Sequence, residues 1–288
     1  MNIKKSSQLL GSHVSISGGF SNAIAEGTEI GCTAIQIFTK SNRRWASKAI
    51  AEKEARDFIS AQKNSLIEVV VSHASYLINL GSVTEEVRRK SLIALVDEIK
   101  RCQRLEIPYL ILHPGTAEAG QKEATLEQTG VFINQALEET KDCSVAVLVE
   151  TMAGQGKSIG SSFEELAAIL KPITHKERIG ICFDTCHTFA AGYDFRTTEG
   201  YTNTMDHFDA TVGLEFLKLF HINDSKKELN SRVDRHENIG EGCMNLEAFS
   251  MIMNDPRFTL IPKILETPHS DELEGDKKNL GVIKSLIK

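Results

Sequence analysis

Side chains of the types that commonly bind metal ions lie at the ends of short apolar segments along this chain of 288 residues. Six successive segments of aliphatic residues end in, or are followed by, a histidine, an aspartate or a glutamate. These residues are His73, His113, Glu150, Asp184, His187, His221 and Glu266. Imidazoles and carboxylates without a thiol form a ligand set that suits zinc or manganese better than magnesium or calcium.

Two further candidates, Asp234 and His236, lie in a long polar segment after His221. In extended backbone, positions i and i+2 point to the same side, so this pair could hold one ion together. The full set then has nine members, more than one ion can use, since a catalytic zinc takes about three or four protein ligands. The set therefore predicts two or three metal ions and a carboxylate shared between them.

The remaining histidines are weaker candidates, because a single histidine at a strand end is more often packed or hydrogen-bonded than metal-bound. His175, His207 and His269 lie in helical or loop surroundings and are predicted to be surface residues. His13 follows the first apolar segment, and we expect it to support the ligands or contact the substrate.

For the nine residues to meet, the apolar segments must be parallel strands that end at one face. Eight segments have the composition of buried strands: residues 9–14, 34–38, 67–71, 109–112, 145–149, 179–183, 216–222 and 261–265. Helical spacing is found between and after them, at residues 51–63, 84–104, 126–141, 163–170, 202–214 and 271–288.

Strands that alternate with helices predict right-handed βαβ units and a parallel sheet. Eight units favour an α/β fold of the closed (β/α)8 TIM-barrel type, in which the loops after the strands build the active site. An open, doubly wound sheet is the alternative, because periodicity does not show closure. No linker divides the chain, so we expect one domain over residues 1–288, with the metal site at the C-terminal face of the strands.

Composition excludes several classes of protein. No segment approaches the roughly 20 apolar residues that a membrane span requires, and the N-terminus has no signal-peptide pattern, so a cytoplasmic protein without membrane association is predicted. The chain has 33 Lys and Arg against 39 Asp and Glu, a net charge of −6. This balance argues against a protein that binds nucleic acid through its overall charge.

Three long segments of the chain contain many of these candidate residues. They are HASYLIN at 73–79, GICFDTCH at 180–187, and HINDSK at 221–226, the last continued by DRH at 234–236 and GEG at 240–242. These segments resemble the signatures of endonuclease IV, the type 2 apurinic/apyrimidinic (AP) endonucleases. The resemblance runs from GSHVS at 11–15 to Glu266, nearly the whole chain.

The resemblance implies three zinc ions in a TIM-type barrel. One ion would be held by His73, His113 and Glu150, the second by Glu150, Asp184, His221 and Glu266, and the third by His187, Asp234 and His236. Glu150 would bridge two ions and is the residue predicted to be catalytic. Three divalent ions would also offset the negative charge of the chain at the metal face, where DNA would bind.

The implied reaction is hydrolysis of duplex DNA on the 5′ side of abasic sites, which leaves a 3′-hydroxyl and a 5′-deoxyribose phosphate. Removal of blocked 3′ ends would use the same site. The resemblance also implies that loops enter the base stack through Arg43, Arg44, Trp45, Tyr76 and Leu77. Arginine and apolar wedges can fill the gap left by an extruded nucleotide. A monomer is expected, because a duplex must reach the barrel mouth.

Two other functions share some of these features. A sugar isomerase or epimerase on a similar divalent-metal barrel needs only one or two ions, so the pair Asp234 and His236, added to His187, would distinguish the endonuclease from it. A damage-binding module with structural metals would bind the lesion without cutting the strand.

Overall fold

Eight parallel strands close into a barrel in the part of the chain that the computed structural model describes, residues 8–268 and 273–288. Neighbouring strands follow the order β1-β10-β7-β6-β5-β4-β3-β2, and the first and last strands, β1 and β10, pair to close the ring. The strands are β1 (Leu10–His13), β2 (Ala34–Ile37), β3 (Val69–His73), β4 (Tyr109–Leu112), β5 (Ala146–Glu150), β6 (Ile179–Asp184), β7 (Leu217–His221) and β10 (Lys263–Leu265). The closed barrel is thus confirmed, and the open sheet is wrong.

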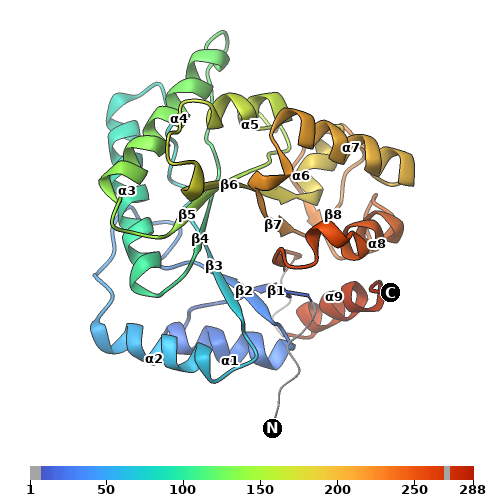
Figure 1. The fold of residues 1–288 in the computed structure, drawn as a ribbon, viewed down its shortest axis with the longest axis horizontal. Coiled ribbons are helices and arrows are strands. Elements are labelled where there is room, and N and C mark those ends of the chain that lie inside the picture. The colour runs from blue at the N-terminus through green and yellow to red at the C-terminus, as the bar shows by residue number, and fades with distance from the viewer. Residues whose placement is uncertain (1–7, 269–272) are drawn as a thin grey trace.

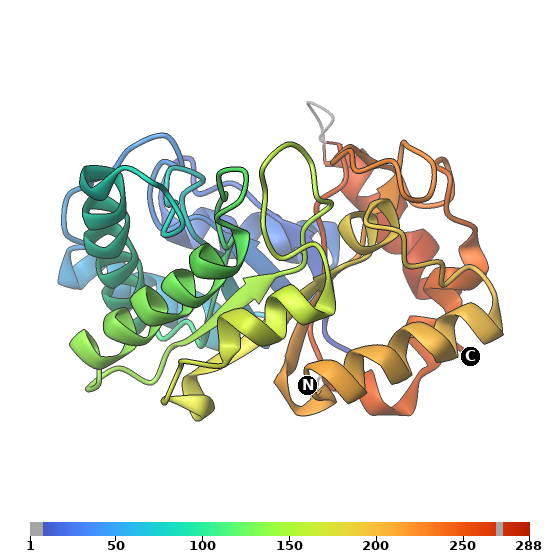
Figure 2. The ribbon, with the colours of Figure 1, turned by 90° about the horizontal axis from the view of Figure 1, so that it is seen from above.

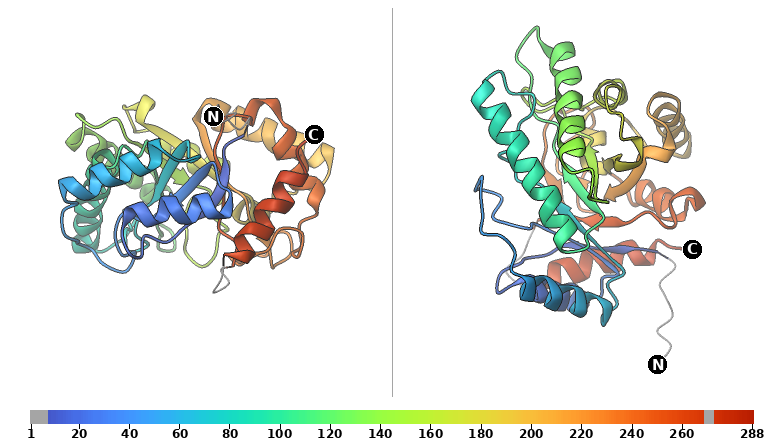
Figure 3. Two further views of the ribbon diagram at one scale, coloured as in Figure 1. Left: turned by 90° about the horizontal axis from the view of Figure 1, so that it is seen from below. Right: turned by 60° about the vertical axis from the view of Figure 1, so that its left-hand side comes forward.

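Helices surround the strands (Figures 1 and 2). They are α1 (Phe20–Ile30), α2 (Glu52–Lys63), α3 (Glu85–Arg104), α4 (Lys122–Glu139), α5 (Phe163–Leu170), α6 (Thr185–Ala190), α7 (Thr198–Thr211), α8 (Leu246–Asn254) and α9 (Glu274–Ser285), with the short 3-10 helices η1 (Lys176–Arg178), η2 (Leu214–Phe216) and η3 (Pro256–Phe258). The last helix, α9, packs beside the first, α1 (Figures 1 and 3). Within the described segments, no helix combines the length and apolar character needed to cross a bilayer.

Three of the strands reach further toward the site than predicted. β3 covers Val69–His73 rather than residues 67–71, and β5 and β6 extend to Glu150 and Asp184. The ladder itself explains the difference, because Glu150 pairs with Cys182 on the next strand. These polar residues are therefore the last residues of their strands rather than the first residues of the loops.

Helix boundaries follow local chemistry. In α3, Glu85 and Glu86 occupy the first turn and Arg101 and Arg104 the last, which places opposite charges at the two poles of the helix dipole. The apolar spacing did not predict α1, α6 or α8. Of these, α6 has only six residues. It begins directly after the candidate ligand Asp184 and contains His187, so it shows no apolar stripe.

The barrel interior holds its own apolar layer, separate from the core between strands and helices. Its members, one from each of seven strands, are Ala34, Val71, Ile111, Leu148, Cys182, Leu219 and Ile264. Their neighbours along the strands, such as Val70 and Leu110, belong to the outer core. This alternation is the period of two that a strand imposes on its side chains.

The second residue after each member of this layer also has its side chain toward the barrel axis. The residues at these positions are Gln36, His73, His113, Glu150, Asp184, His221 and Glu266. The layer of apolar side chains is thus the floor of a polar site at the C-terminal ends of the strands, where TIM barrels carry their active sites.

A second small sheet extends the face above β7. Strands β8 (Asp224–Ser225) and β9 (His236–Glu237) pair in antiparallel fashion. The Asp224 carboxylate anchors this loop by accepting hydrogen bonds from the backbone N–H groups of Ser225, Gly240, Gly242 and Met244. One buried carboxylate therefore holds the segment that carries Asp234 and His236.

Lys263, the first residue of β10, is only 2% exposed. Its Nζ donates to the carbonyl oxygens of Phe258 at 2.6 Å and Ile261 at 3.1 Å, and burial lowers its pKa to about 8. Because the unfolded chain keeps the ordinary value of 10.5, the folded state binds fewer protons between these pH values. The buried ammonium therefore lowers the free energy of unfolding below pH 8, and this destabilisation disappears as the pH rises from 8 to 10.5.

We predict that the unfolding free energy of the wild type gains about 3 kcal/mol relative to Lys263→Met between pH 8 and 10.5. Chemical denaturation of both proteins across this range measures the difference. Lys53→Met removes a largely exposed lysine and is the control for the loss of one cation. A constant difference for Lys263→Met would contradict the shifted pKa.

Candidate metal centre

The nine candidate ligands meet at one end of the barrel. Six stand at or directly after the ends of β3, β4, β5, β6, β7 and β10, as the alternation above requires. His187 comes from α6, whose N-terminus is capped by Asp184: the Oδ1 of Asp184 accepts from the backbone N–H of His187 at 2.7 Å. Asp234 lies in the loop between β8 and β9, and His236 is the first residue of β9.

Glu150 lies at the centre of the group with no exposed surface. Its Oε2 is 3.2 Å from Nε2 of His73 and 3.1 Å from Nε2 of His113. Its Oε1 is 3.0 Å from Nδ1 of His221 and 3.3 Å from Nδ1 of His187. One carboxylate therefore faces four imidazoles from four different elements.

These contacts decide the charge of the carboxylate. Burial by itself raises the pKa of Glu150, but the imidazoles of His221 and His113 outweigh it and hold the pKa well below its usual range. At Asp234, burial also opposes ionisation, yet the contact with His187 lowers the pKa to about 2. Both carboxylates are therefore ionised at neutral pH, the form in which they bind metals.

His187 shows the opposite shift. Burial lowers its pKa, but Asp184 and Asp234 outweigh burial and raise the pKa well above the usual value. A proton thus stabilises the carboxylates when no metal does so. Because an imidazole must lose this proton to bind a metal, metal binding at this site would release protons.

The ligand sets implied by the resemblance each come together in space. In each set one ligand atom per residue lies within 4.8 Å of the others. The sets are His73, His113 and Glu150; Glu150, Asp184, His221 and Glu266; and His187, Asp234 and His236. The geometry thus places the predicted ligands correctly for shared binding, while their role as ligands stays a prediction.

Two cysteines lie close to the same groups. Cys182 approaches Glu150 and His221, and Cys186 approaches Asp184 and His236. Burial raises the pKa of both thiols to about 12, so they remain protonated near neutral pH. Since the thiolate is the ligand form of cysteine, the expectation of a thiol-free ligand set agrees with this chemistry.

The donor atoms fit a metal with short bonds. Nε2 of His187 and Nε2 of His236 are buried and have no hydrogen-bond partner among the described residues. They lie 3.2 Å and 3.5 Å from Oδ1 of Asp234. Two ligand atoms about 2.1 Å from a tetrahedral zinc are about 3.4 Å apart, so these separations match a shared ion.

The other nitrogen of each ring is held by the backbone. Nδ1 of His187 donates to the carbonyl oxygen of Thr151 at 2.9 Å, and Nδ1 of His236 donates to that of Glu266 at 2.9 Å. Each bond leaves Nε2 of the neutral ring with a lone pair that is available to a metal ion. Metal-binding histidines are typically fixed in this way.

Sequence reasoning missed two buried amides at the site. Asn223 donates from Nδ2 to Oδ2 of Asp184 at 2.7 Å, and its Oδ1 accepts from the backbone N–H of Glu266 at 2.8 Å. Gln36 contacts His221 and Glu266. Both were detectable as polar residues next to, or within, apolar strands, although neither is itself a metal ligand.

The residues predicted to contact DNA lie around the same face with different exposures. Arg43 and Arg44 are exposed on the loop after β2. Trp45 is half-buried and packs against the outer core. Tyr76 is 54% exposed, and Leu77 beside it is half-buried. Their contacts with DNA remain predictions, but Trp45 has a packing role that the sequence did not reveal.

Tyr76 connects this rim to the metal ligands. Its ring centroid lies 5.1 Å from that of His73, 5.3 Å from that of His113 and 5.7 Å from that of Phe38. A cavity of about 380 Å³ opens beside it, lined by His13, Phe38, Tyr76, His236, Glu266, Thr267 and Pro268. The site therefore has an aromatic wall at the edge of an accessible hollow.

The other histidines differ from this group. His207 is exposed and pairs with Glu164 at 2.8 Å, and half-buried His175 pairs with Glu138 at 2.9 Å. Both lie on the outside of the barrel, as predicted for surface residues. His269 lies outside the described residues.

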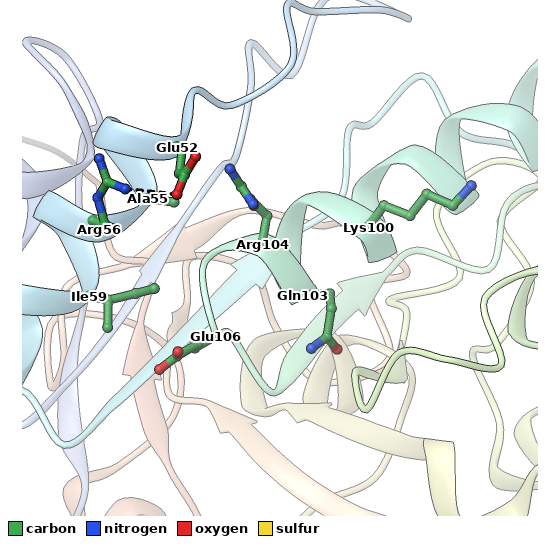
Figure 4. A pocket seen from close by; sticks show the side chains of 8 residues that line it. All are labelled: Glu52, Ala55, Arg56, Ile59, Lys100, Gln103, Arg104 and Glu106. Atoms are coloured by element: carbon green, nitrogen blue, oxygen red, sulfur yellow. Dashed lines mark hydrogen bonds and ion pairs between the residues drawn. The ribbon is translucent and has the colours of Figure 1, made fainter.

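A second hollow of about 490 Å³ lies on the outer surface, between α2 and α3 (Figure 4). Its lining mixes cations and anions: Glu52, Ala55, Arg56, Ile59, Lys100, Gln103, Arg104 and Glu106. None of these residues belongs to a metal-type group in the described segments. This hollow therefore offers no chemistry comparable to that of the barrel mouth.

Comparison with known proteins agrees with the geometry. Residues 24–286 match the profile of a family described as Xylose isomerase-like TIM barrel. The "Probable endonuclease 4" of Chloroflexus aurantiacus is 47% identical over 277 residues, which cover 96% of this chain and 97% of the relative. The chain belongs to the endonuclease IV family. The crystal structure of endonuclease IV from Thermus thermophilus matches with a TM-score of 0.85 and 35% identity, covering 96% of this chain and 98% of the other.

Epimerases share the fold of the endonuclease IV family at greater distance. A D-tagatose 3-epimerase-like protein matches with a TM-score of 0.73 and 20% identity, over 96% of both chains. At this identity the likeness concerns the barrel alone.

Loss of the Asp234 carboxylate is predicted to remove one metal ion from each chain. Asp234→Asn preserves the shape of the side chain but removes the carboxylate from the group that Asp234 forms with His187 and His236. After chelation and reloading with zinc, elemental analysis should find one ion fewer than in the wild type. The metal-dependent gain in stability should shrink as well, since a site filled at a hundred times its Kd contributes about 2.7 kcal/mol.

Asp206→Asn, on the exposed face of α7, is the matched control and should retain the metal content of the wild type. Equal metal content in all three proteins would exclude Asp234 as a ligand.

Proposed function

We propose that this protein is a zinc-dependent AP endonuclease that hydrolyses the phosphodiester on the 5′ side of abasic sites in duplex DNA. The observation that carries the proposal is the group His187, Asp234 and His236, which adjoins the two groups that share Glu150. The membership of the endonuclease IV family and the 47% identity to a relative named as an endonuclease support it.

Each of three zinc ions would have its own group of ligands. His73, His113 and Glu150 would hold one, the set around His221 a second, and the group that contains Asp234 a third. Zinc in such a site lowers the pKa of a bound water from 15.7 towards about 7 and stabilises charge on the reacting phosphate. Imidazole and carboxylate ligands at these separations favour zinc over magnesium or calcium.

The protein's own residues determine how DNA would be held. Glu150 has both oxygens engaged by imidazoles, so it orders the centre as a permanent anion and does not carry protons. Arg43 and Arg44 are free to reach phosphates from the exposed loop after β2. Tyr76 presents an exposed ring next to the ligands, where it could replace an extruded nucleotide in the stack.

The products would be a 3′-hydroxyl and a 5′-deoxyribose phosphate, and blocked 3′ ends would be cleaned at the same centre. A monomer acting in the cytoplasm suits this role, because the duplex must reach the open barrel mouth. A sugar isomerase or epimerase would need only one or two ions. In such an enzyme the group His187, Asp234 and His236 would have no metal ion to bind.

Nicking of a duplex with one abasic site is the experiment that tests the proposal. We expect a chelator to abolish cleavage and added zinc to restore it. Glu150→Gln should lose at least one metal and reduce cleavage more than about 100-fold, because even outer-shell partners of a metal are worth about 10- to 100-fold. Glu127→Gln, on the exposed face of α4, should cut normally. Full activity of Glu150→Gln would refute the assignment, and binding without cutting by the wild type would indicate a damage-binding module.

Tyr76→Ala is expected to weaken binding of the abasic duplex by about 1–3 kcal/mol, the range measured for aromatic stacking on bases. Its zinc content should stay at the wild-type level, because Tyr76 belongs to none of the ligand groups. Leu260→Ala removes a side chain that is 79% exposed just before β10, at the opposite end of the barrel, and should leave binding unchanged. Fluorescence anisotropy compares the three proteins, and unaltered affinity in Tyr76→Ala would exclude the wedge role.

A further inference from the structure

Gln36 occupies a position in the ring of candidate ligands, although its amide is not among the side chains that zinc usually takes as ligands. It follows Ala34 of the interior layer by two residues, as His73 follows Val71. Gln36 has no exposed surface. A buried amide that lacks partners costs about 1–3 kcal/mol per unsatisfied group, so its contacts explain why it is tolerated there.

Among residues 8–268 and 273–288, the amide of Gln36 bonds to side chains alone. Its Oε1 lies 2.7 Å from Nε2 of His221, and its Nε2 lies 2.5 Å from Oε1 of Glu266 and 2.9 Å from Nδ1 of His13. By contrast, Oδ1 of Asn223 accepts a hydrogen bond from the backbone N–H of Glu266. Gln36 therefore satisfies no backbone group by these contacts and connects two strand-end residues across the barrel.

Only one orientation of this amide is consistent with its neighbours. The carboxylate of Glu266 accepts hydrogen bonds and does not donate them, so the NH2 group of Gln36 must face it. The reverse orientation would bring two oxygen atoms to 2.5 Å. Oε1 must then accept from His221, and this places the proton of the neutral ring on Nε2.

A neutral imidazole protonated on Nε2 has its lone pair on Nδ1. Nδ1 of His221 lies 3.0 Å from Oε1 of Glu150 and 3.2 Å from Oε2 of Glu266. Both separations are close to the spacing of about 3.4 Å between ligand atoms on one zinc. The amide thus directs the free nitrogen of His221, and the second oxygen of Glu266, toward the same point.

We propose that Gln36 is a positioning residue of the metal centre. It selects the tautomer of His221 that binds through Nδ1, and it orients Glu266, so that the set Glu150, Asp184, His221 and Glu266 is ready for zinc. The inference rests on the proposed function, because it concerns one of the zinc positions assigned there.

Gln36→Met tests this role, because methionine has nearly the same shape and no hydrogen-bonding amide. The zinc dissociation constant of the weakest site should rise about 10- to 100-fold, the usual loss when a partner of a metal ligand is removed. Gln103→Met removes an amide near the other end of the barrel that bonds to Ser144, and it should bind zinc as the wild type does. Competition with a chromophoric chelator measures all three proteins. A change of less than twofold in Gln36→Met would overturn the inference.

A second measurement needs no variant of Gln36. Nitrogen-15 NMR of histidine-labelled, zinc-loaded wild type should show the proton of His221 on Nε2 and the metal on Nδ1, with the signal assigned by its loss in His221→Gln. The opposite tautomer, in a wild type that binds its full zinc complement, would overturn the inference and leave the proposed function intact. A wild type that binds no zinc would overturn both.

Discussion

A carboxylate that is removed from water at the centre of a protein must be compensated, and Glu150 imposes this requirement on the whole barrel mouth. Four imidazoles meet it, and they come from β3, β4, α6 and β7. Each imidazole then needs a fixed ring orientation, which for His187 comes from the carbonyl of Thr151, the residue that follows Glu150. The fixed orientation of these rings is therefore a consequence of one buried charge.

Much of this arrangement is readable from the residues, because a strand has a strict period of two. Once Val71, Ile111 and Leu148 are assigned inward, the positions of His73, His113 and Glu150 follow. The sequence prediction considered the residue that follows each apolar segment. It did not consider the residue two positions after each inward-facing side chain. The segment at 34–38 continues as far as Phe38, so this approach passed over Gln36 inside it, although the alternation places Gln36 in the ring.

Other features depend on contacts that no local pattern records. Trp45 stands in a polar loop, and only the folded chain shows that it packs against the core. Asp224 looks like one more acid in a charged segment, yet its four backbone partners are spread over the residues up to Met244. The apolar spacing of the sequence does not predict the short helix α6, because its six residues include the candidate ligand His187 and form no apolar stripe. Long-range packing, and not propensity, decides each of these cases.

The pairing of β1 with β10 has a consequence for the order of events during synthesis. The barrel becomes a ring only when Lys263 to Leu265 lie against Leu10 to Ser12, and Glu266 follows directly. A growing chain can form its early βα units beforehand, but it must hold an open sheet edge until the last strand emerges from the ribosome. The group Glu150, Asp184, His221 and Glu266 is therefore completed last, because Glu266 follows the strand that closes the ring.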